Sequence, residues 1–326
     1  MNKRQIFRGL TAMLLALCLT AQAAAYPAAL VPVGAAVGIR METDGVVVTG
    51  FDDGAPARAA GLKTGDVIRS VDGAAVTQAA ELARAVQDSG GRTLTLTALR
   101  RGKSVELSVT PGCAGGGYRL GVYLRDGIAG IGTVTYYDPE TGAYGALGHG
   151  ISDRGSTQLL PIAGGTLLHA DVVGVSRGAR GSPGQLRGAF GADGGLGTVE
   201  RNTDCGIFGR MDYDGELPAA LPVASREEVT AGPATVRCTV AGCTVREFTV
   251  NIDRVSPDSA LGREIALTVT DPALIEQTGG IVQGLSGAPI VQGGKLVGAV
   301  THVLVSEPRQ GYGILIDTML REAYGE

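Results

Sequence analysis

The hydrophobic pattern of this chain begins with one apolar run and then breaks into many short segments. Residues 10–20 are almost all apolar, follow the basic residues Lys3, Arg4 and Arg8, and are followed by small residues at 21–25. A charged start, a short apolar run and a small-residue end are typical of an export signal. We therefore predict that residues 1–25 are a signal peptide or a temporary membrane anchor, and that the protein is exported across the cytoplasmic membrane.

Residues 37–110 alternate between strand-like and helix-like patterns. Strands are predicted at 37–41, 45–49, 67–71, 93–99 and 104–109, and the apolar residues of 79–88 recur at helical spacing. Between them, residues 55–73 read Ala-Pro-Ala-x-x-Ala-Gly-Leu-x-x-Gly-Asp-x-Ile and end in Asp-Gly. This segment resembles the PDZ domains of secreted bacterial proteases. The resemblance implies that a peptide is bound by strand addition, with its end received by Gly38, Ile39, Arg40 and Met41.

The remainder of the chain is predicted to be rich in short strands. Residues 111–118 have the composition of a linker, and residues 119–326 contain many short apolar runs broken by glycines. Helical patterns are confined to 271–277 and 317–323. The 52 glycines, the aromatic content of 4% and the absence of Trp agree with a barrel or sandwich of short strands.

Charge and cysteine content narrow the function. With 28 basic and 32 acidic residues and no basic block beyond the N-terminus, the chain is not expected to bind nucleic acid. Cys113, Cys205, Cys238 and Cys243 do not have zinc-site spacing, and we expect no metal or cofactor. Cys238 and Cys243 flank a turn-like segment and could form a disulfide or stay unpaired, and the pattern leaves both open.

The stretch Gly284-Leu285-Ser286-Gly287 suggests catalytic chemistry. Glycines permit a tight bend that can lift a serine hydroxyl into a cleft and aim nearby backbone N–H groups at one point. A nucleophile beside an oxyanion hole needs that geometry. The alternative is a glycine-rich hairpin that carries an incidental serine.

A serine nucleophile needs a base, and usually an acid that orients the base. The chain contains three histidines. His149 lies between glycines at the end of a strand-like run and is the preferred base, whereas His169 could lie on a strand face and His302 could line the cleft. Asp271 is the preferred acid, although Asp-Pro at a helix start can simply be an N-cap. The sequence leaves other aspartates open as the acid: Asp153, Asp171 and Asp253.

Several stretches together carry a specific family resemblance. They are residues 121–126, 144–149, 200–203, 206–209, 278–289 and 299–303. With them the chain resembles the stage IV sporulation protein B family of serine peptidases, whose members carry an export segment, a PDZ domain and a C-terminal peptidase domain. The resemblance implies a mainly β protein, in which a small PDZ domain precedes a chymotrypsin-like double β-barrel peptidase domain at 119–326.

The resemblance also assigns roles to individual residues. It implies a triad of His149, Asp271 and Ser286, with the N–H groups of Gly284 and Ser286 stabilising the oxyanion. It further implies that the strand containing Val300, Thr301 and His302 pairs with an extended substrate.

The family's activity implies a secreted sporulation endopeptidase. Such an enzyme works between the forespore and mother-cell membranes, cleaves the membrane-bound regulator of an intramembrane metalloprotease so that a late sigma factor is activated, and also cleaves itself. The alternative is a non-catalytic PDZ-containing protein that tethers a membrane partner. The joint presence of His149 and Ser286 in glycine-framed positions favours the peptidase.

Overall fold

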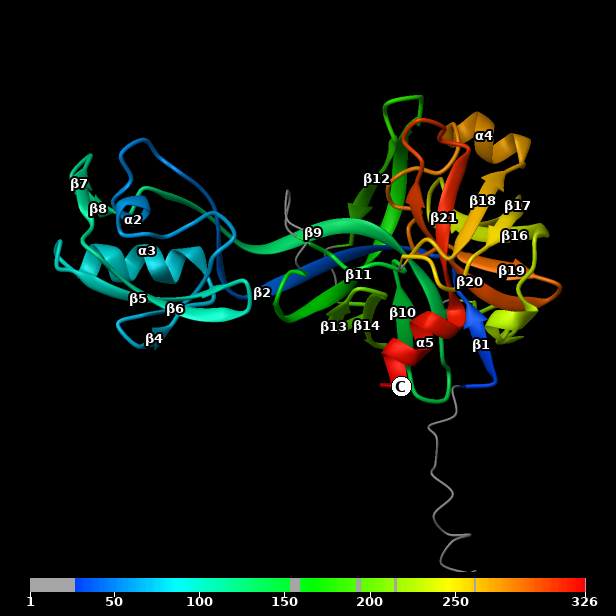
Figure 1. Ribbon diagram of the computed structural model, residues 1–326, viewed down its shortest axis with the longest axis horizontal. Coiled ribbons are helices and arrows are strands. Elements are labelled where there is room, and N and C mark those ends of the chain that lie inside the picture. Colours follow the sequence, from blue (N-terminus) through cyan, green and yellow to red (C-terminus); the bar gives the residue numbers. More distant parts are fainter. Residues whose placement is uncertain (1–26, 153–158, 192–194, 214–215, 261, 326) are drawn as a thin grey trace, which may run out of the picture.

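The computed structural model describes residues 27–152, 159–191, 195–213, 216–260 and 262–325. The predicted export segment, residues 1–25, lies outside these ranges. The protein is mainly β, as predicted, and consists of a PDZ domain and a peptidase domain built on two barrels (Figure 1). Among the described residues, no helix is both long and apolar enough to span a membrane.

Six strands form the first barrel, because each of them pairs with two others in a ring. The ring runs β2–β9–β10–β14–β13–β11 and returns to β2. Its inward side chains are apolar, as the alternating pattern requires. The strands are β2 (Ala36–Phe51), β9 (Val122–Tyr137), β10 (Ala143–Ala146), β11 (Ile162–Ser176), β13 (Gly197–Thr203) and β14 (Gly206–Met211). Three further strands extend this sheet: β1 (Ala29–Pro32), β12 (Gln185–Phe190) and β15 (Leu221–Pro222).

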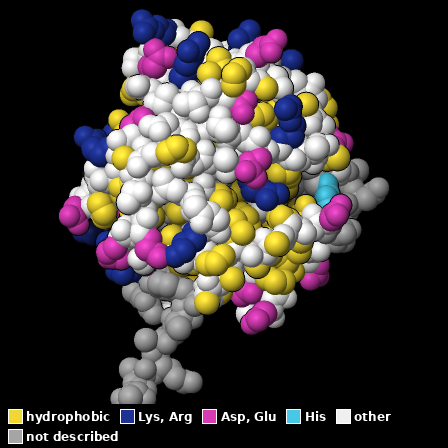
Figure 2. Space-filling model, turned by 90° about the vertical axis from the view of Figure 1, so that its right-hand side faces the viewer, with side chains coloured by type: hydrophobic (Ala, Val, Ile, Leu, Met, Phe, Trp, Pro, Cys, Tyr) yellow, Lys and Arg dark blue, Asp and Glu magenta, His cyan; other side chains and the backbone are white. Residues whose placement is uncertain are grey.

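The second barrel is a closed ring of six strands in the order β16–β17–β18–β21–β20–β19. Phe248, Ile252 and Ile290 are among the apolar side chains buried in its core. The strands are β16 (Gly232–Thr239), β17 (Val245–Val255), β18 (Ile265–Val269), β19 (Pro289–Gln292), β20 (Lys295–Val303) and β21 (Gln310–Leu315). On the face shown in Figure 2, basic and acidic side chains are interspersed around an apolar area instead of being separated by sign.

Helices close the peptidase domain. Helix α4 (Pro272–Thr278) follows β18, and helix α5 (Ile316–Tyr324) follows β21. A single helical turn, η1 (Arg226–Glu228), precedes β16. The inner face of α5 packs Met319 and Leu320 against Tyr136 and Phe208 of the first barrel, in a core that also includes Ile314 of the second. Helix α5 therefore helps to fix the two barrels against each other. Both helices were predicted to within about one residue at each end.

The PDZ domain sits at the end of a two-stranded arm. Strands β2 and β9 leave the first barrel side by side and stay paired up to Phe51 and Val122 (Figure 1). The domain adds α2 (Pro56–Ala59), β3 (Val67–Val71), β4 (Ala74–Ala75), α3 (Ala79–Asp88), β5 (Leu94–Arg100), β6 (Lys103–Val109), β7 (Gly112–Ala114) and β8 (Gly117–Arg119). The helix predicted at 79–88 is confirmed as α3, whose Leu82 and Val86 are buried.

One electrostatic contact stabilises the PDZ domain from within. Asp66, only 1% exposed, accepts hydrogen bonds from both the Nε and the Nη2 of Arg100, at 2.8 and 2.6 Å, and from the backbone N–H of Lys63. The Arg100 guanidinium also donates to the Gly61 carbonyl oxygen. These bonds compensate the cost of burying the Asp66 carboxylate. They tie the Gly-Leu-x-x-Gly-Asp segment to strand β5.

Two sequence-based predictions about this region are wrong. Gly38, Ile39, Arg40 and Met41 do not form a peptide-receiving edge, because they lie in β2 inside the first barrel. Each pairs with β9 on one side and β11 on the other, so no edge is free for an added strand. The segment predicted as a linker, residues 111–118, instead contributes to the hairpin β7–β8, and its Tyr118 packs against the PDZ core.

The sequence left disulfide pairing open among Cys113, Cys205, Cys238 and Cys243, and all four are free thiols. Cys238 is buried in the second barrel, whereas Cys243 is exposed. Burial raises the pKa of the Cys238 thiol to about 12, so this residue stays protonated and packs as a small hydrophobe.

Candidate active site

The Ser286 loop lies between helix α4 and strand β19, where the two barrels meet. The loop is compact, because Leu285 N–H donates to the Val282 carbonyl and Ala288 N–H to the Leu285 carbonyl. The N–H of Gly287 donates to the Val300 carbonyl at 2.7 Å and ties the loop to β20. Ser286 is half-buried, and its hydroxyl donates to the Thr301 carbonyl at 2.8 Å.

Gly287 is required at its position for two reasons. Its φ of +96° lies in a region that L-residues with a side chain rarely adopt. A Cβ built on it would lie 2.0 Å from the carbonyl oxygen of Thr133 and 2.5 Å from the backbone nitrogen of Leu147. The nucleophile loop therefore approaches the first barrel as closely as a backbone can.

His149 reaches the same place from the first barrel. It follows β10 after Leu147, a non-glycine residue at φ +70°. This left-handed turn directs the chain out of the barrel wall toward the second barrel, where Gly148 packs against Thr301 and Ile314. His149 Nδ1 lies 2.9 Å from the Gly150 carbonyl oxygen. A carbonyl only accepts, so Nδ1 carries the proton and Nε2 keeps its lone pair.

Ser286 and His149 line one cleft of about 430 Å³ between the barrels. The structure therefore brings the predicted nucleophile and the predicted base together. Thr301 and His302 of β20 line the cleft as well, and none of the described lining residues is Asp, Glu, Lys or Arg. The other lining residues are mainly apolar: Ile39, Ile128, Gly130, Ile131, Leu147, Ile151, Pro183, Ile281, Val282, Gln283, Gly284, Val303 and Val305.

The two histidines of the cleft lie against each other, with ring centroids 5.2 Å apart and ring planes at 36°. Removal of water by burial lowers the pKa of His149, and the Gly150 carbonyl offsets this only in part. The pKa of His302 is lowered by desolvation and next by the neighbouring charge of His149. Both rings are therefore neutral at neutral pH, and a neutral His149 can accept a proton.

The two N–H groups predicted to stabilise the oxyanion are not hydrogen-bonded to other groups of the described residues. The N–H groups of Gly284 and Ser286 donate to no carbonyl or side chain of the described residues. Both belong to the loop that carries the nucleophile, and Gly284 lines the cleft with Ser286. An oxyanion hole requires such unpaired donors beside the attacking oxygen.

Asp271 is not brought to this cleft. One of its carboxylate oxygens accepts from the N–H groups of Ala273 and Leu274, and the other accepts from the N–H of Thr249. Asp271 is thus the N-cap of α4. Ala266 of β18 pairs with Tyr312, which also pairs with His302. Asp271 lies five positions further along the chain, beyond the end of β18 at Val269, and it does not line the cleft.

No carboxylate takes the place of Asp271 among the described residues. Asp253 accepts hydrogen bonds from Asn251 and Thr268, and Asp171 is exposed on β11; neither lines the cleft. Asp153, the other alternative, lies outside the described residues. Within the described part of the chain, the group that holds the His149 ring is the Gly150 carbonyl.

Sequence reasoning missed two residues that support the site. Thr133 and Thr135 of β9 are fully buried, and their hydroxyls donate to the carbonyl oxygens of Gly284 and Gly287, both at 2.8 Å. Two threonines that flank a buried valine, and so share the opposite face of the strand, are the signal that could have found them. A backbone acceptor such as the Gly150 carbonyl leaves no such signal.

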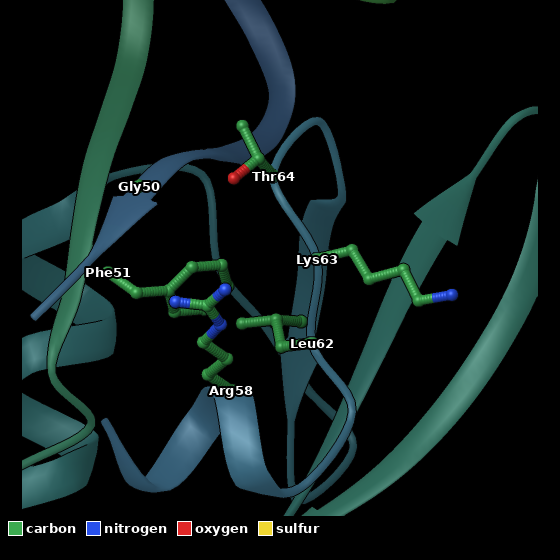
Figure 3. A pocket seen from close by; sticks show the side chains of 6 residues that line it. All are labelled: Gly50, Phe51, Arg58, Leu62, Lys63 and Thr64. Carbon is green, nitrogen blue, oxygen red and sulfur yellow. The ribbon is translucent and has the colours of Figure 1, made fainter. Parts of the chain in front are cut away.

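A second depression, of about 360 Å³, lies on the PDZ domain (Figure 3). Arg58 stacks over the Phe51 ring, with its guanidinium carbon 6.0 Å from the ring centroid. The depression contains no residue of the Ser286 cleft. Its lining is Gly50, Phe51, Arg58, Leu62, Lys63 and Thr64.

Comparison with known proteins identifies both domains of the chain. The family model "SpoIVB peptidase S55" matches residues 116–320, and the model of the PDZ domain matches residues 36–110. Since the first match covers more than half of the chain, the protein belongs to the SpoIVB peptidase S55 family. It is a serine peptidase that carries a PDZ domain.

Relatives with curated descriptions match over a shorter region. A putative zinc metalloprotease of Lactococcus lactis is 41% identical over 71 residues, which are 22% of this chain and 17% of that protein. A probable periplasmic serine endoprotease of the DegP-like type from Brucella suis is 39% identical over 79 residues, 24% of this chain and 15% of that protein. The chain thus spans less than a fifth of the length of each.

Among solved structures, the active form of the Rv3671c protease of Mycobacterium tuberculosis is similar at a TM-score of 0.32. Its identity is 13%, and the match covers 58% of this chain and 70% of that one. The PDZ domain of an SdrC-like protein from Listeria monocytogenes is 27% identical at a TM-score of 0.24, over 26% of this chain and 90% of that domain.

Proposed function

We propose that this peptidase cleaves peptide bonds with Ser286 as nucleophile and His149 as general base. The observation that carries the proposal is the convergence of these two residues, from different barrels, in one cleft beside two N–H groups that have no acceptor among the described residues. Ser286 rotates its hydroxyl from the Thr301 carbonyl toward His149 Nε2 and attacks the substrate carbonyl. His149 takes the serine proton and returns it to the leaving amine.

The backbone supplies the remaining catalytic groups. The N–H groups of Gly284 and Ser286 stabilise the oxyanion, where the loss of one donor costs about 3–4 kcal/mol. The Gly150 carbonyl holds the His149 ring in the tautomer that the reaction requires. Asp271 is left out of this mechanism because both of its carboxylate oxygens accept hydrogen bonds from α4 and the adjoining strand.

The cleft favours apolar substrates. Its described lining residues include no Asp, Glu, Lys or Arg, and its two histidines are neutral at neutral pH, so a charged substrate residue would lose water without gaining a partner there. We propose that an extended segment with apolar side chains binds along Val300, Thr301 and His302. Of these, Thr301 and His302 line the cleft.

We propose that the PDZ domain binds a peptide on the outer edge of β9. Over residues 122–125, β9 pairs with β2 on one side, and no described strand pairs with the other side. Helix α3 flanks this edge: Asp126 accepts from its first N–H, at Ala79, and Gln87 bonds both backbone groups of Tyr118. Peptide binding by strand addition uses an exposed sheet edge of this type.

In the cell, we propose that the protein acts outside the cytoplasm during sporulation, between the forespore and mother-cell membranes. Its substrates would be the membrane-bound regulator of an intramembrane metalloprotease, whose cleavage leads to late sigma-factor activation, and its own chain. The family membership and the export-like N-terminus support this proposal. The competing function is a PDZ-containing tether with an inert barrel.

The decisive experiment compares the full chain with Ser286→Ala. We would measure labelling by a fluorophosphonate, self-cleavage on a gel, and cleavage of an extracytoplasmic fragment of the candidate regulator. The parent should label and cleave, and Ser286→Ala should lose at least about a thousandfold in rate. Equal cleavage by both would remove Ser286 as nucleophile, and two inert proteins that both bind the fragment would support the tether.

The inert variant also tests the PDZ proposal. Binding of the fragment to Ser286→Ala should slow amide hydrogen exchange at residues 122–126. Residues 38–41 serve as the internal control, because their N–H groups are already enclosed between two strands. Protection at neither segment would contradict strand addition at β9.

A further inference from the structure

Thr133 forms hydrogen bonds to both segments that carry the proposed catalytic residues, the Ser286 loop and the turn before His149. It lies in β9 of the first barrel and is 0% exposed. Its N–H donates to the Ser286 carbonyl at 3.0 Å, and its carbonyl accepts from Leu147 N–H at 3.2 Å. Its hydroxyl donates to the Gly284 carbonyl at 2.8 Å. One residue therefore contacts both the nucleophile loop and the turn that leads to His149.

The hydroxyl contributes something that the backbone bonds do not. Any residue at 133 would supply the N–H and the carbonyl, but only a hydroxyl at this point can donate to the Gly284 carbonyl. Gly284 has φ of +102° and no side chain of its own to restrict it. The hydrogen bond to its carbonyl fixes the peptide plane between Gly284 and Leu285, and so restrains the ψ angle of the residue whose N–H is the proposed oxyanion donor.

We propose that Thr133 is a positioning residue, whose buried hydroxyl sets the orientation of the Gly284–Ser286 backbone and so assembles the oxyanion hole. The proposal rests on the function proposed above. The hydroxyl touches neither substrate nor reacting atoms. Its loss should therefore weaken the binding of the transition state and leave the binding of the substrate largely unchanged.

A series of substitutions in the full chain tests this role. Thr133→Val keeps the shape and removes the donor, and Thr133→Ser keeps the donor. We expect Thr133→Val to lower kcat about 10- to 100-fold with little change in KM, since complete loss of one oxyanion donor lowers kcat about 10²- to 10³-fold. Thr133→Ser should recover kcat to within a few-fold of the parent.

The matched control is Thr239→Val. Thr239 is also buried, at 1% exposure, and its hydroxyl accepts from Ala36 N–H and donates to the Gly34 carbonyl, away from the cleft. It should lose stability as Thr133→Val does but keep the parent kcat. If Thr239→Val lost kcat equally, or if Thr133→Ser were as slow as Thr133→Val, the role of Thr133 would be structural only.

Two further readouts separate the possible outcomes. The affinity for a peptide boronate, whose oxygen occupies the oxyanion hole, should fall in parallel with kcat in Thr133→Val. Amide exchange at Leu285 and Gly287, whose N–H groups donate to the Val282 and Val300 carbonyls, should accelerate. If Thr133→Val does not fold, Thr133→Ala serves in its place. A parent chain that a fluorophosphonate fails to label would overturn the proposed function and this inference together, whereas a labelled parent with a fully active Thr133→Val would overturn the inference alone.

Discussion

The Asp271 turn and the Ser286 loop are fifteen positions apart in the sequence but are held in opposite ways. The bonds of Asp271 go to its own helix α4 and to the adjoining β17, at Thr249. The carbonyls of Gly284, Ser286 and Gly287 are instead held by Thr133 and Thr135 from the first barrel. The Asp271 carboxylate is already used by its own helix and the adjoining strand, so it serves the structure. The loop is held through its carbonyls, and the N–H groups of Gly284 and Ser286 have no acceptor among the described residues.

The largest effect is expected from a substitution that separates the loop from the first barrel. Gly287→Ala should destabilise the protein by about 3 kcal/mol and abolish labelling by a fluorophosphonate, because its Cβ would overlap the Thr133 carbonyl at a positive φ. Chemical denaturation and labelling measure both effects. The control is Gly293→Ala, which has φ of +58° but no atom within 4 Å, and should cost only about 1–2 kcal/mol. Equal losses in both variants would show that close approach is not what matters at Gly287.

A change of pH is expected to have a smaller effect on kcat/KM, because it protonates His149, the proposed base from the first barrel. The pKa of His149 is lowered, so kcat/KM should stay high down to pH values below the ordinary histidine pKa of about 6.5, and then fall about tenfold per unit as Nε2 is protonated. Burial of the neutral ring also makes the folded state bind the proton more weakly than the unfolded state. The free energy of unfolding should therefore decline as the pH falls below about 6.5.

A pH series of kcat/KM and of denaturation midpoints checks these expectations. His169→Gln is the control, because His169 is exposed on β11 and does not line the cleft. It should leave the pH profile of activity unchanged. A kcat/KM midpoint above about 6.5 would mean that a carboxylate supports His149 after all.

The smallest effect is expected at Asp271. Asn at an N-cap accepts the same hydrogen bonds as Asp, so Asp271→Asn should be nearly neutral, and Asp271→Ala should lower the free energy of unfolding by about 1 kcal/mol. Neither should change kcat by more than a few-fold once the folded fraction is taken into account. If both variants lost about 10³- to 10⁴-fold in kcat while staying folded, Asp271 would be the catalytic acid and the comparison above would be wrong.

The sequence predicted the helices and strands of this protein better than it predicted which strands pair with one another. Helix α3 and helix α4 were predicted closely, because their apolar spacing and their caps are local features. The strand at Gly38–Met41 was also real, but its predicted role as a peptide-receiving edge was not, because it is paired on both sides. Strand pairing is decided between segments far apart in the chain, and here β2 is long enough to belong to the barrel at one end and to the PDZ domain at the other.

The candidate site also has features that the sequence indicated and features that only the tertiary structure showed. The sequence alone indicated Ser286 and His149, because a functional side chain framed by glycines is a local pattern that bends the backbone wherever it occurs. Only the tertiary structure showed that Thr133 holds the loop, that the Gly150 carbonyl holds the base, and that Asp271 is used as a helix cap. These are hydrogen bonds made largely by backbone groups, which every residue carries, so the packing of the two barrels and not the residue type decides which of them meet.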